Sequence, residues 1–174
     1  MREISEQLQL SKPALYHHFR DKQTLLLEVL MAGIEQAGSL VTQAADSPGG
    51  TRSRVSVLLS SIALNRHAQM NAMRLAEREA VHLSAQAREA MHAAYRSKFL
   101  QPIEELLLSG QTAGELRADA DPAWLTRALL VLAQPLLSVD EPDSGSLVAA
   151  TVALFFEGAG GRQASGSTLT GSAT

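Results

Sequence analysis

Apolar residues recur at helical spacing along most of the chain. A repeat at i, i+3, i+4 and i+7, or at i, i+4, i+7 and i+11, places apolar side chains on one face of an α-helix. Two such stripes are clear, one over Val55, Leu58, Leu59, Ile62 and Ala63 and one over Leu125, Leu129, Leu132 and Leu136. Ala, Leu and Ser lead the composition, and runs of β-branched residues are almost absent. The pattern therefore predicts an all-α fold.

Caps, prolines and glycines divide these stripes into separate helices. Asp21, Ser84 and Asp121 are predicted N-caps, because their side chains can accept a hydrogen bond from the first helical turn. Pro102 and Pro135 should bend or end the helices that contain them. The predicted helices cover about 22–45, 51–69, 71–82, 84–111, 121–136 and 144–157, with turns at 47–50 and 140–143.

The first residues predict two short helices joined by a tight turn. Ile4 and Leu8 lie one turn apart in the first, and Ser11 is the N-cap of the second. Leu15 and Phe19 share one face of the second helix. The opposite face is cationic and aromatic and carries Lys12, Pro13, Tyr16 and His17. Small polar helices of this kind are typical of proteins that enter a DNA groove, although an ordinary helical corner with a solvated face is the alternative.

Charge is unevenly distributed along the chain. The net charge is −3, yet residues 1–22 carry +1 and residues 103–174 carry −6. Acidic residues therefore gather far from the candidate DNA-binding helix. This asymmetry is compatible with DNA binding by one end of the molecule.

Several other classes of function are disfavoured. The absence of cysteine excludes disulfides and thiolate metal sites. Glu79 with His82 and Glu89 with His92 have the spacing of di-iron ligands, but the inward-facing glutamates that such bundles also need are not evident. No nucleophile elbow or phosphate-binding glycine loop is present. We therefore expect no cofactor and no enzymatic activity, with an all-α enzyme as a remote alternative.

The sequence also bears on location. No basic, apolar leader opens it, and no run of about 18 apolar residues could span a membrane. We expect a cytoplasmic protein with no membrane partner. Residues 159–174 are rich in Gly, Ser, Thr and Ala and predict a disordered tail.

The segment 2–22 resembles the helix-turn-helix of TetR-family transcriptional repressors. The general form of that motif is R-(D/E)-I-A, a short turn, and S-x-x-x-L-Y-x-H-F-x-x-K. Here it stands as Arg2-Glu3-Ile4-Ser5 followed by residues 11–22, and residues 114–119, G-E-L-R-A-D, are also typical of the family. The resemblance implies a partial DNA-binding domain with its connecting helix over 1–45. A helical ligand-binding and dimerisation domain would then cover 46–158.

The helix-turn-helix geometry implies particular DNA contacts. Residues near the start of the second helix face base edges in the major groove, which suits Lys12, Pro13, Ala14 and His17. By resemblance, Arg2 would also reach a base, while Tyr16, His18 and Lys22 would hold phosphates. These contacts imply double-stranded operator DNA as the partner.

The motif departs from the family pattern in three places. Ser5 replaces the usual alanine, and Leu8-Gln9 replaces small turn residues. The first helix of the family, which lies upstream of the motif, has no counterpart in this sequence. We expect either that the natural reading frame begins further upstream or that the chain is a truncated product. The alternative function is then a ligand-binding and dimerisation module that no longer binds DNA.

The resemblance further implies a small apolar effector and a homodimer through the last two helices. The residues best suited to shape an effector pocket are His67, Met70, Met73, Tyr95, Phe99 and Trp124, with plain core packing as the alternative for each. The last two helices are apolar on more than one face, so they need several neighbours. Burial within one monomer is the alternative to dimerisation. Ligand binding would relieve repression.

Overall fold

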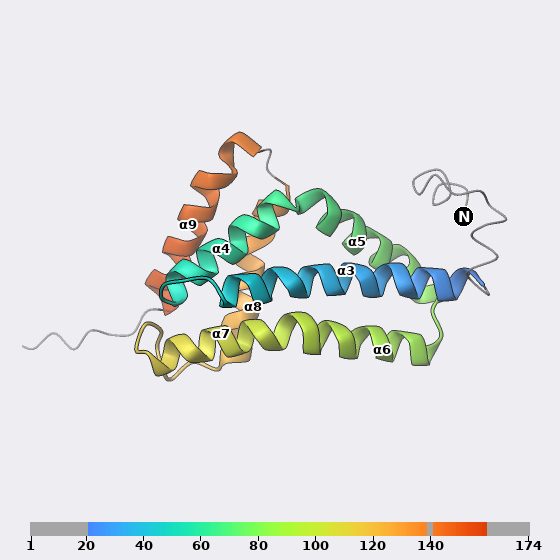
Figure 1. Cartoon of the computed structure of the whole chain (residues 1–174), viewed down its shortest axis with the longest axis horizontal. Coiled ribbons are helices and arrows are strands. Elements are labelled where there is room, and N and C mark those ends of the chain that lie inside the picture. Colours follow the sequence, from blue (N-terminus) through green and yellow to red (C-terminus); the bar gives the residue numbers. More distant parts are fainter. Residues whose placement is uncertain (1–20, 139–140, 160–174) are drawn as a thin grey trace, which may run out of the picture.

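The computed structural model describes residues 21–138 and 141–159, and all elements in this part are helices (Figure 1). In chain order they are α3 (Lys22–Ala45), α4 (Thr51–Leu64), α5 (Arg66–Glu79), η1 (Ala80–His82), α6 (Ala85–Tyr95), η2 (Arg96–Leu100), α7 (Gln101–Thr112), α8 (Pro122–Ala133), η3 (Gln134–Leu137) and α9 (Glu141–Ala159). The long helix α3 runs beside the rod formed by α6, η2 and α7, while α4 and α5 cover its other side. The all-α prediction is confirmed.

Three helices begin where their caps predict. A carboxylate oxygen of Asp21 accepts a hydrogen bond from the Thr24 backbone N–H at 2.8 Å. Asp121 caps α8 through the Ala123 N–H at 3.0 Å. Ser84 likewise caps α6 by accepting from the backbone of residue 87 at 3.2 Å. Each cap satisfies a backbone donor that has no partner inside its own helix.

Two predicted boundaries are wrong. The break after α4 falls at Asn65, five positions before the predicted one near residue 70. The Asn65 amide donates to the Ser61 carbonyl at 2.9 Å, and no glycine or proline marks the joint. The last helix begins at Glu141, not near residue 144, because Pro142 occupies the first turn, where its missing N–H costs little. The predicted tail after residue 159 lies outside the described residues.

The expected irregularity at Pro102 takes the form of a π-helical turn. The five residues Arg96–Leu100 form η2, and α7 follows without a break in the rod. Pro102 has no N–H to donate to the Lys98 carbonyl, as an α-helix would require. That carbonyl lies against α3, where a Cβ on Gly38 would stand only 2.5 Å from its oxygen. At the same level, Glu35 of α3 forms an exposed ion pair with Lys98.

The buried apolar residues form two separate clusters. The main core joins α3, α4, η2, α7, α8, η3 and α9 and contains fully buried side chains such as Val55, Leu58 and Ile103. A smaller cluster, which we call the α3–α5 cluster, has Leu26, Leu30 and Leu83 at its centre and Leu27, Leu75, Ala76, Ala87 and Met91 around it. The C-terminal half of α3 therefore packs in the main core, while its N-terminal half packs in the α3–α5 cluster.

The expectation that no segment is apolar enough to span a membrane is wrong for α3. Residues Gln23–Ala45 of α3 are long and apolar enough to cross a bilayer, with a mean hydropathy of 1.4. In this structure 33% of that stretch is buried, and α3 packs against α4, α5, α6 and α7. Core helices with such neighbours reach the same apolarity, so length and composition give weak evidence for a membrane span.

Candidate DNA-binding and ligand-binding sites

Most predicted DNA contacts lie outside the described residues. These are Arg2, Lys12, Pro13, Ala14, Tyr16, His17 and His18. Lys22 is the first residue of α3, although its side chain is not among those described. The assignments of individual base and phosphate contacts therefore stay predictions.

The start of α3 is described and shows how this helix is held. Hydrogen bonds from the Thr24 backbone N–H and hydroxyl lower the pKa of the exposed Asp21 carboxyl. Four and five residues after Asp21, Leu25 and Leu26 are buried. The backbone that follows the predicted recognition helix thus continues directly into the α3–α5 cluster.

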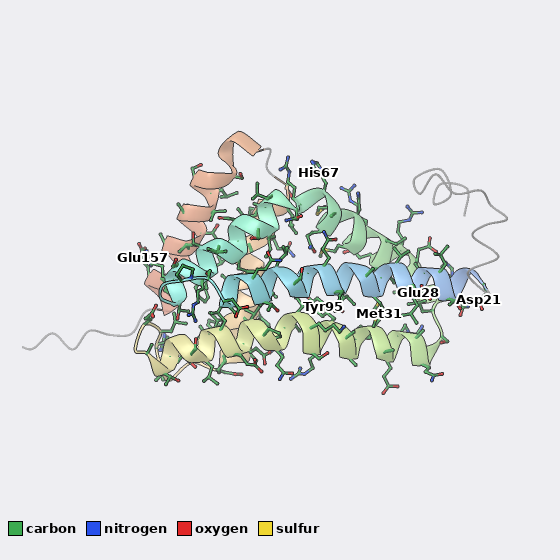
Figure 2. All side chains as sticks on the ribbon, viewed as in Figure 1. Asp21, Glu28, Met31, His67, Tyr95 and Glu157 are labelled. Atoms are coloured by element: carbon green, nitrogen blue, oxygen red, sulfur yellow. The ribbon has the colours of Figure 1, made fainter. Side chains whose placement is uncertain are left out.

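The six residues predicted to shape a pocket do not gather in one place. Met70 and Met73 line a common hollow, whereas Tyr95 stacks on Phe99 with ring centroids 5.4 Å apart on the other side of α3. Phe99 belongs to the main core, and burial raises the pKa of the Tyr95 hydroxyl. His67 and Trp124 are exposed, and Figure 2 shows His67 on the outer side of α5, away from α3.

The hollow that contains the two methionines lies between α5 and η3. It has a volume of about 200 Å³ and is lined by Met70, Met73, Arg74, Glu77, Gln134, Leu137 and Ser138. Sequence reasoning missed the last five of these. The spacing i, i+3, i+4, i+7 from Met70 indicates Arg74 and Glu77 as its neighbours on one helix face. No local signal places η3 opposite that face.

A second, polar groove of about 530 Å³ runs between α3 and the η2–α7 joint. Glu35, Asp46 and Lys98 lie along it, together with Gly38, Ser39, Thr42, Gln43, Ser97 and Pro102. The groove passes Pro102 and is open and lined mostly by polar side chains. This surface does not resemble an apolar ligand pocket.

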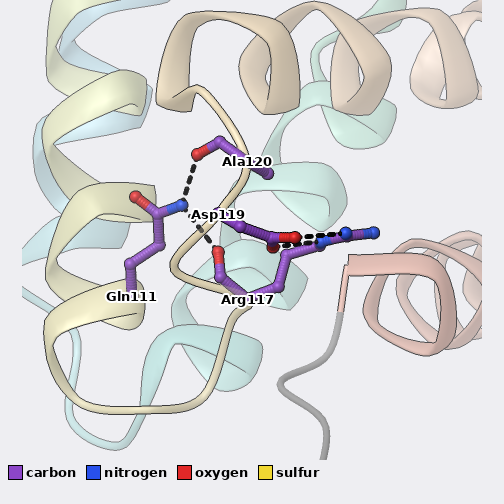
Figure 3. A network of polar contacts seen from close by, with 4 residues as sticks. All are labelled: Gln111, Arg117, Asp119 and Ala120. Carbon is purple, nitrogen blue, oxygen red and sulfur yellow. Dashed lines mark hydrogen bonds and ion pairs between the residues drawn. The ribbon is translucent and has the colours of Figure 1, made fainter.

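The G-E-L-R-A-D segment has a structural role at the joint between α7 and α8 (Figure 3). The Gln111 amide donates to the backbone carbonyls of Arg117 at 2.8 Å and Ala120 at 2.7 Å. Hydrogen bonding to Asp119 raises the pKa of the Arg117 guanidinium. Leu116 is buried, and Glu115 accepts weakly from the Arg52 backbone N–H at 3.4 Å, near the start of α4. The segment thereby orients α8.

The exposed apolar residues of the last helices form a candidate partner-binding surface. Trp124 and Val131 of α8 are 58% and 67% exposed, and Leu154 of α9 is 58% exposed. Val148, Val152 and Phe155 on α9 are buried within the monomer. The two helices therefore pack in the core with one side and keep apolar groups free on another.

The two Glu-x-x-His pairs considered as metal ligands, Glu79 with His82 and Glu89 with His92, do not form a metal site with other described side chains. His82 and His92 are exposed, as is Glu89. Within the described ranges, no three or more histidine and carboxylate side chains are placed to hold one ion.

Comparison with known proteins identifies similar sequences for the start of the chain and similar structures for the helical fold. Residues 1–29 match the family model described as bacterial regulatory proteins, tetR family. The matched segment covers the predicted helix-turn-helix and the start of α3. No curated protein sequence matches the chain.

Solved structures match over almost the whole chain. PfmR, a TetR family transcriptional regulator from Thermus thermophilus, has a TM-score of 0.67 and 21% identity over 90% of this chain and 86% of that one. AibR, solved in complex with isovaleryl coenzyme A and operator DNA, has a TM-score of 0.68 and 19% identity over 88% and 85%. A regulatory protein in the tetR family from Rhodococcus RHA1 has a TM-score of 0.70 and 22% identity over 91% and 85%.

These observations define an all-α protein with a helix-turn-helix match ahead of a helical domain. The resemblance to the TetR family is confirmed, because the family model matches the start of the chain and the described helices have the fold of TetR-family transcriptional regulators. The structural likeness establishes the fold.

Proposed function

We propose that the protein is a DNA-binding transcriptional regulator without enzymatic activity, acting in the cytoplasm as a ligand-relieved repressor. The observation that carries the proposal is the family match over residues 1–29 joined to a TetR-family fold. The first part supplies a DNA-reading helix, and the second supplies a helical body to which a ligand can bind.

A homodimer through α8 and α9 is part of this proposal. The exposed apolar groups at Trp124, Val131 and Leu154 support it, because a second copy would cover them. A twofold dimer also presents two recognition helices to successive major grooves, which suits a near-palindromic operator.

Binding of a small molecule is supported by the hollow beside α5 and by one similar structure. AibR was solved with both isovaleryl coenzyme A and operator DNA. We propose that a small apolar molecule biases this dimer between a DNA-binding and a non-binding state. Such a ligand must bind the two states with different affinity.

DNA binding is tested by electrophoretic mobility shift with promoter DNA from upstream of the gene. We expect a retarded band that weakens steeply as salt rises, because phosphate contacts release counterions. Dimerisation and ligand binding with no shift, even at low salt, would favour the alternative of a module that no longer binds DNA.

Two alanine variants distinguish the predicted phosphate contact from the predicted base contact. Lys22→Ala should weaken binding to all DNA sequences alike and lower the salt dependence by about one unit of slope, because a phosphate contact is lost. Lys12→Ala should instead change the preference among operator sequences, at about 1–3 kcal/mol for the affected base pair. Unchanged affinity in Lys22→Ala would refute the phosphate assignment.

A further inference from the structure

The exposed side of α8 leads directly into the hollow between α5 and η3. Side chains on this side recur at alternating steps of three and four residues, and all of them are exposed: Trp124, Arg127, Val131, Gln134 and Ser138. This spacing keeps them on one side of a helix. The first three lie on α8, which we propose as part of the dimer interface, whereas Gln134 and Ser138 line the hollow. The interface and the hollow therefore lie on one continuous surface.

Across the hollow, α5 continues this surface. Met73 lines the hollow and is 44% exposed, so it is one of the large apolar side chains that a single chain leaves open to solvent. Met70, three residues before it, and Glu77, four residues after it, lie on the same side of α5. Leu75 and Ala76 pack against the α3–α5 cluster instead. One side of α5 is thus held within the chain, while the other faces the hollow.

The apolar groups on α8 and α9 alone are few for a stable dimer. A standard-size interface buries about 800 Å² on each partner, from about 20–30 residues. Trp124, Val131 and Leu154 are three side chains and supply only part of such an area. Extending the interface past Gln134 to Met73 adds exposed surface that adjoins it directly.

The hollow within one chain is a poor ligand site. Its volume is about 200 Å³, below the roughly 300–1,000 Å³ of most ligand pockets, and Met73 at its rim is open to solvent. Pockets normally bury most of the surface of a bound small molecule. A further wall over the open side would exclude water from the apolar groups of Met70, Met73 and Leu137.

We propose that a second copy of this chain supplies that wall. The dimer interface extends from α8 over η3 to α5, and the hollow becomes a closed effector site only in the dimer. The inference rests on the proposed function, because it gives the proposed dimer a part in forming the effector site. A molecule enclosed between the two copies stabilises the dimer, and dimerisation raises the affinity for that molecule by the same factor.

Thiol labelling of the full chain tests this cover, because the chain has no cysteine of its own. Met73→Cys places a single thiol at the rim of the hollow. Val81→Cys on η1, where the valine is 67% exposed, is the matched control. With an excess of an anionic aromatic disulfide reagent at about pH 8, we expect the Met73→Cys thiol to react at least tenfold more slowly in the dimer than after dilution to the monomer. The Val81→Cys thiol should react at one rate throughout, and sedimentation velocity of the same samples gives the fraction of dimer.

A second substitution separates cover by the partner from local effects. Adding Val131→Glu to the Met73→Cys chain should restore fast labelling at high protein concentration, because the dimer is weakened. The new negative charge would by itself repel the anionic reagent and slow the reaction, so faster labelling reports uncovering of the hollow.

Equal labelling of Met73→Cys in monomer and dimer, or equal slowing of Val81→Cys, would overturn the proposal. A dimer that leaves Met73→Cys reactive refutes the cover and leaves the proposed regulator intact. A chain that stays monomeric refutes both the cover and the homodimer. A mobility shift with promoter DNA in the same samples then shows separately whether the chain binds DNA.

Discussion

The buried hydroxyl groups of Thr126 and Thr151 differ in their hydrogen bonding, and substitution of each residue can test the consequence for stability. Both are buried, on α8 and α9. The Thr151 hydroxyl donates to the Leu147 carbonyl at 2.8 Å. The Thr126 hydroxyl has no hydrogen-bond partner among the described residues. A buried hydroxyl without a partner loses its hydration with no compensation.

Replacing the hydroxyl by a methyl group should therefore have opposite effects at the two positions. We expect Thr126→Val to raise the free energy of unfolding by about 1 kcal/mol, because valine has no hydroxyl that must lose its water on folding. Thr151→Val is the control and should lower it by about 0.5–1.5 kcal/mol, because a hydrogen bond is removed. Urea unfolding measures both. A loss of stability in Thr126→Val would show that its hydroxyl is satisfied.

At the scale of elements, the contact between α3 and η2 determines how the long helix is seated. The π-helical turn places the Lys98 carbonyl against Gly38. A Cβ atom added to Gly38 would stand 2.5 Å from the carbonyl oxygen. Pro102 was predicted to disturb the rod, and it does lie beside the turn. The approach of Gly38 was not predictable, because its partner is 60 residues distant in the sequence.

Gly38→Ala should lower the free energy of unfolding by about 1–3 kcal/mol, because backbone must move to admit the methyl group. The higher helix propensity of alanine, about 1 kcal/mol, offsets only part of this cost. Gly145→Ala in α9 is the matched control, since nothing lies within 4 Å of the added carbon. It should raise stability in the same urea unfolding assay. Equal gains at both sites would contradict the tight contact.

At the scale of the whole molecule, the distribution of exposed apolar groups decides how copies associate. Val131 on α8 and Val81 on η1 are both 67% exposed, so they form a matched pair. Only Val131 lies on the helices that we propose to dimerise.

We expect Val131→Glu to weaken dimerisation at least tenfold, because each copy would bury an unpaired negative charge in the proposed interface. Val81→Glu should leave the association unchanged. Sedimentation velocity over a range of concentrations distinguishes the two outcomes. A dimer equally stable in both variants would place the interface elsewhere.

Sequence alone determined the helical class, the bounds of α3, the three capped helix starts and the family resemblance. Each depends on neighbours within a few residues or on a short motif. The break at Asn65 carried no such mark, because the adjoining residues all have adequate helix propensity.

Only the tertiary structure decided which side chains meet. Met70 and Met73 line one hollow with residues of η3. Tyr95 and Phe99 stack on each other on the η2 side, and Trp124 is exposed on α8. The two clusters along α3 and the opposite faces of α5 likewise arise from contacts between distant segments. Helical periodicity indicates that a face is apolar, but which helix covers it depends on packing of the whole chain.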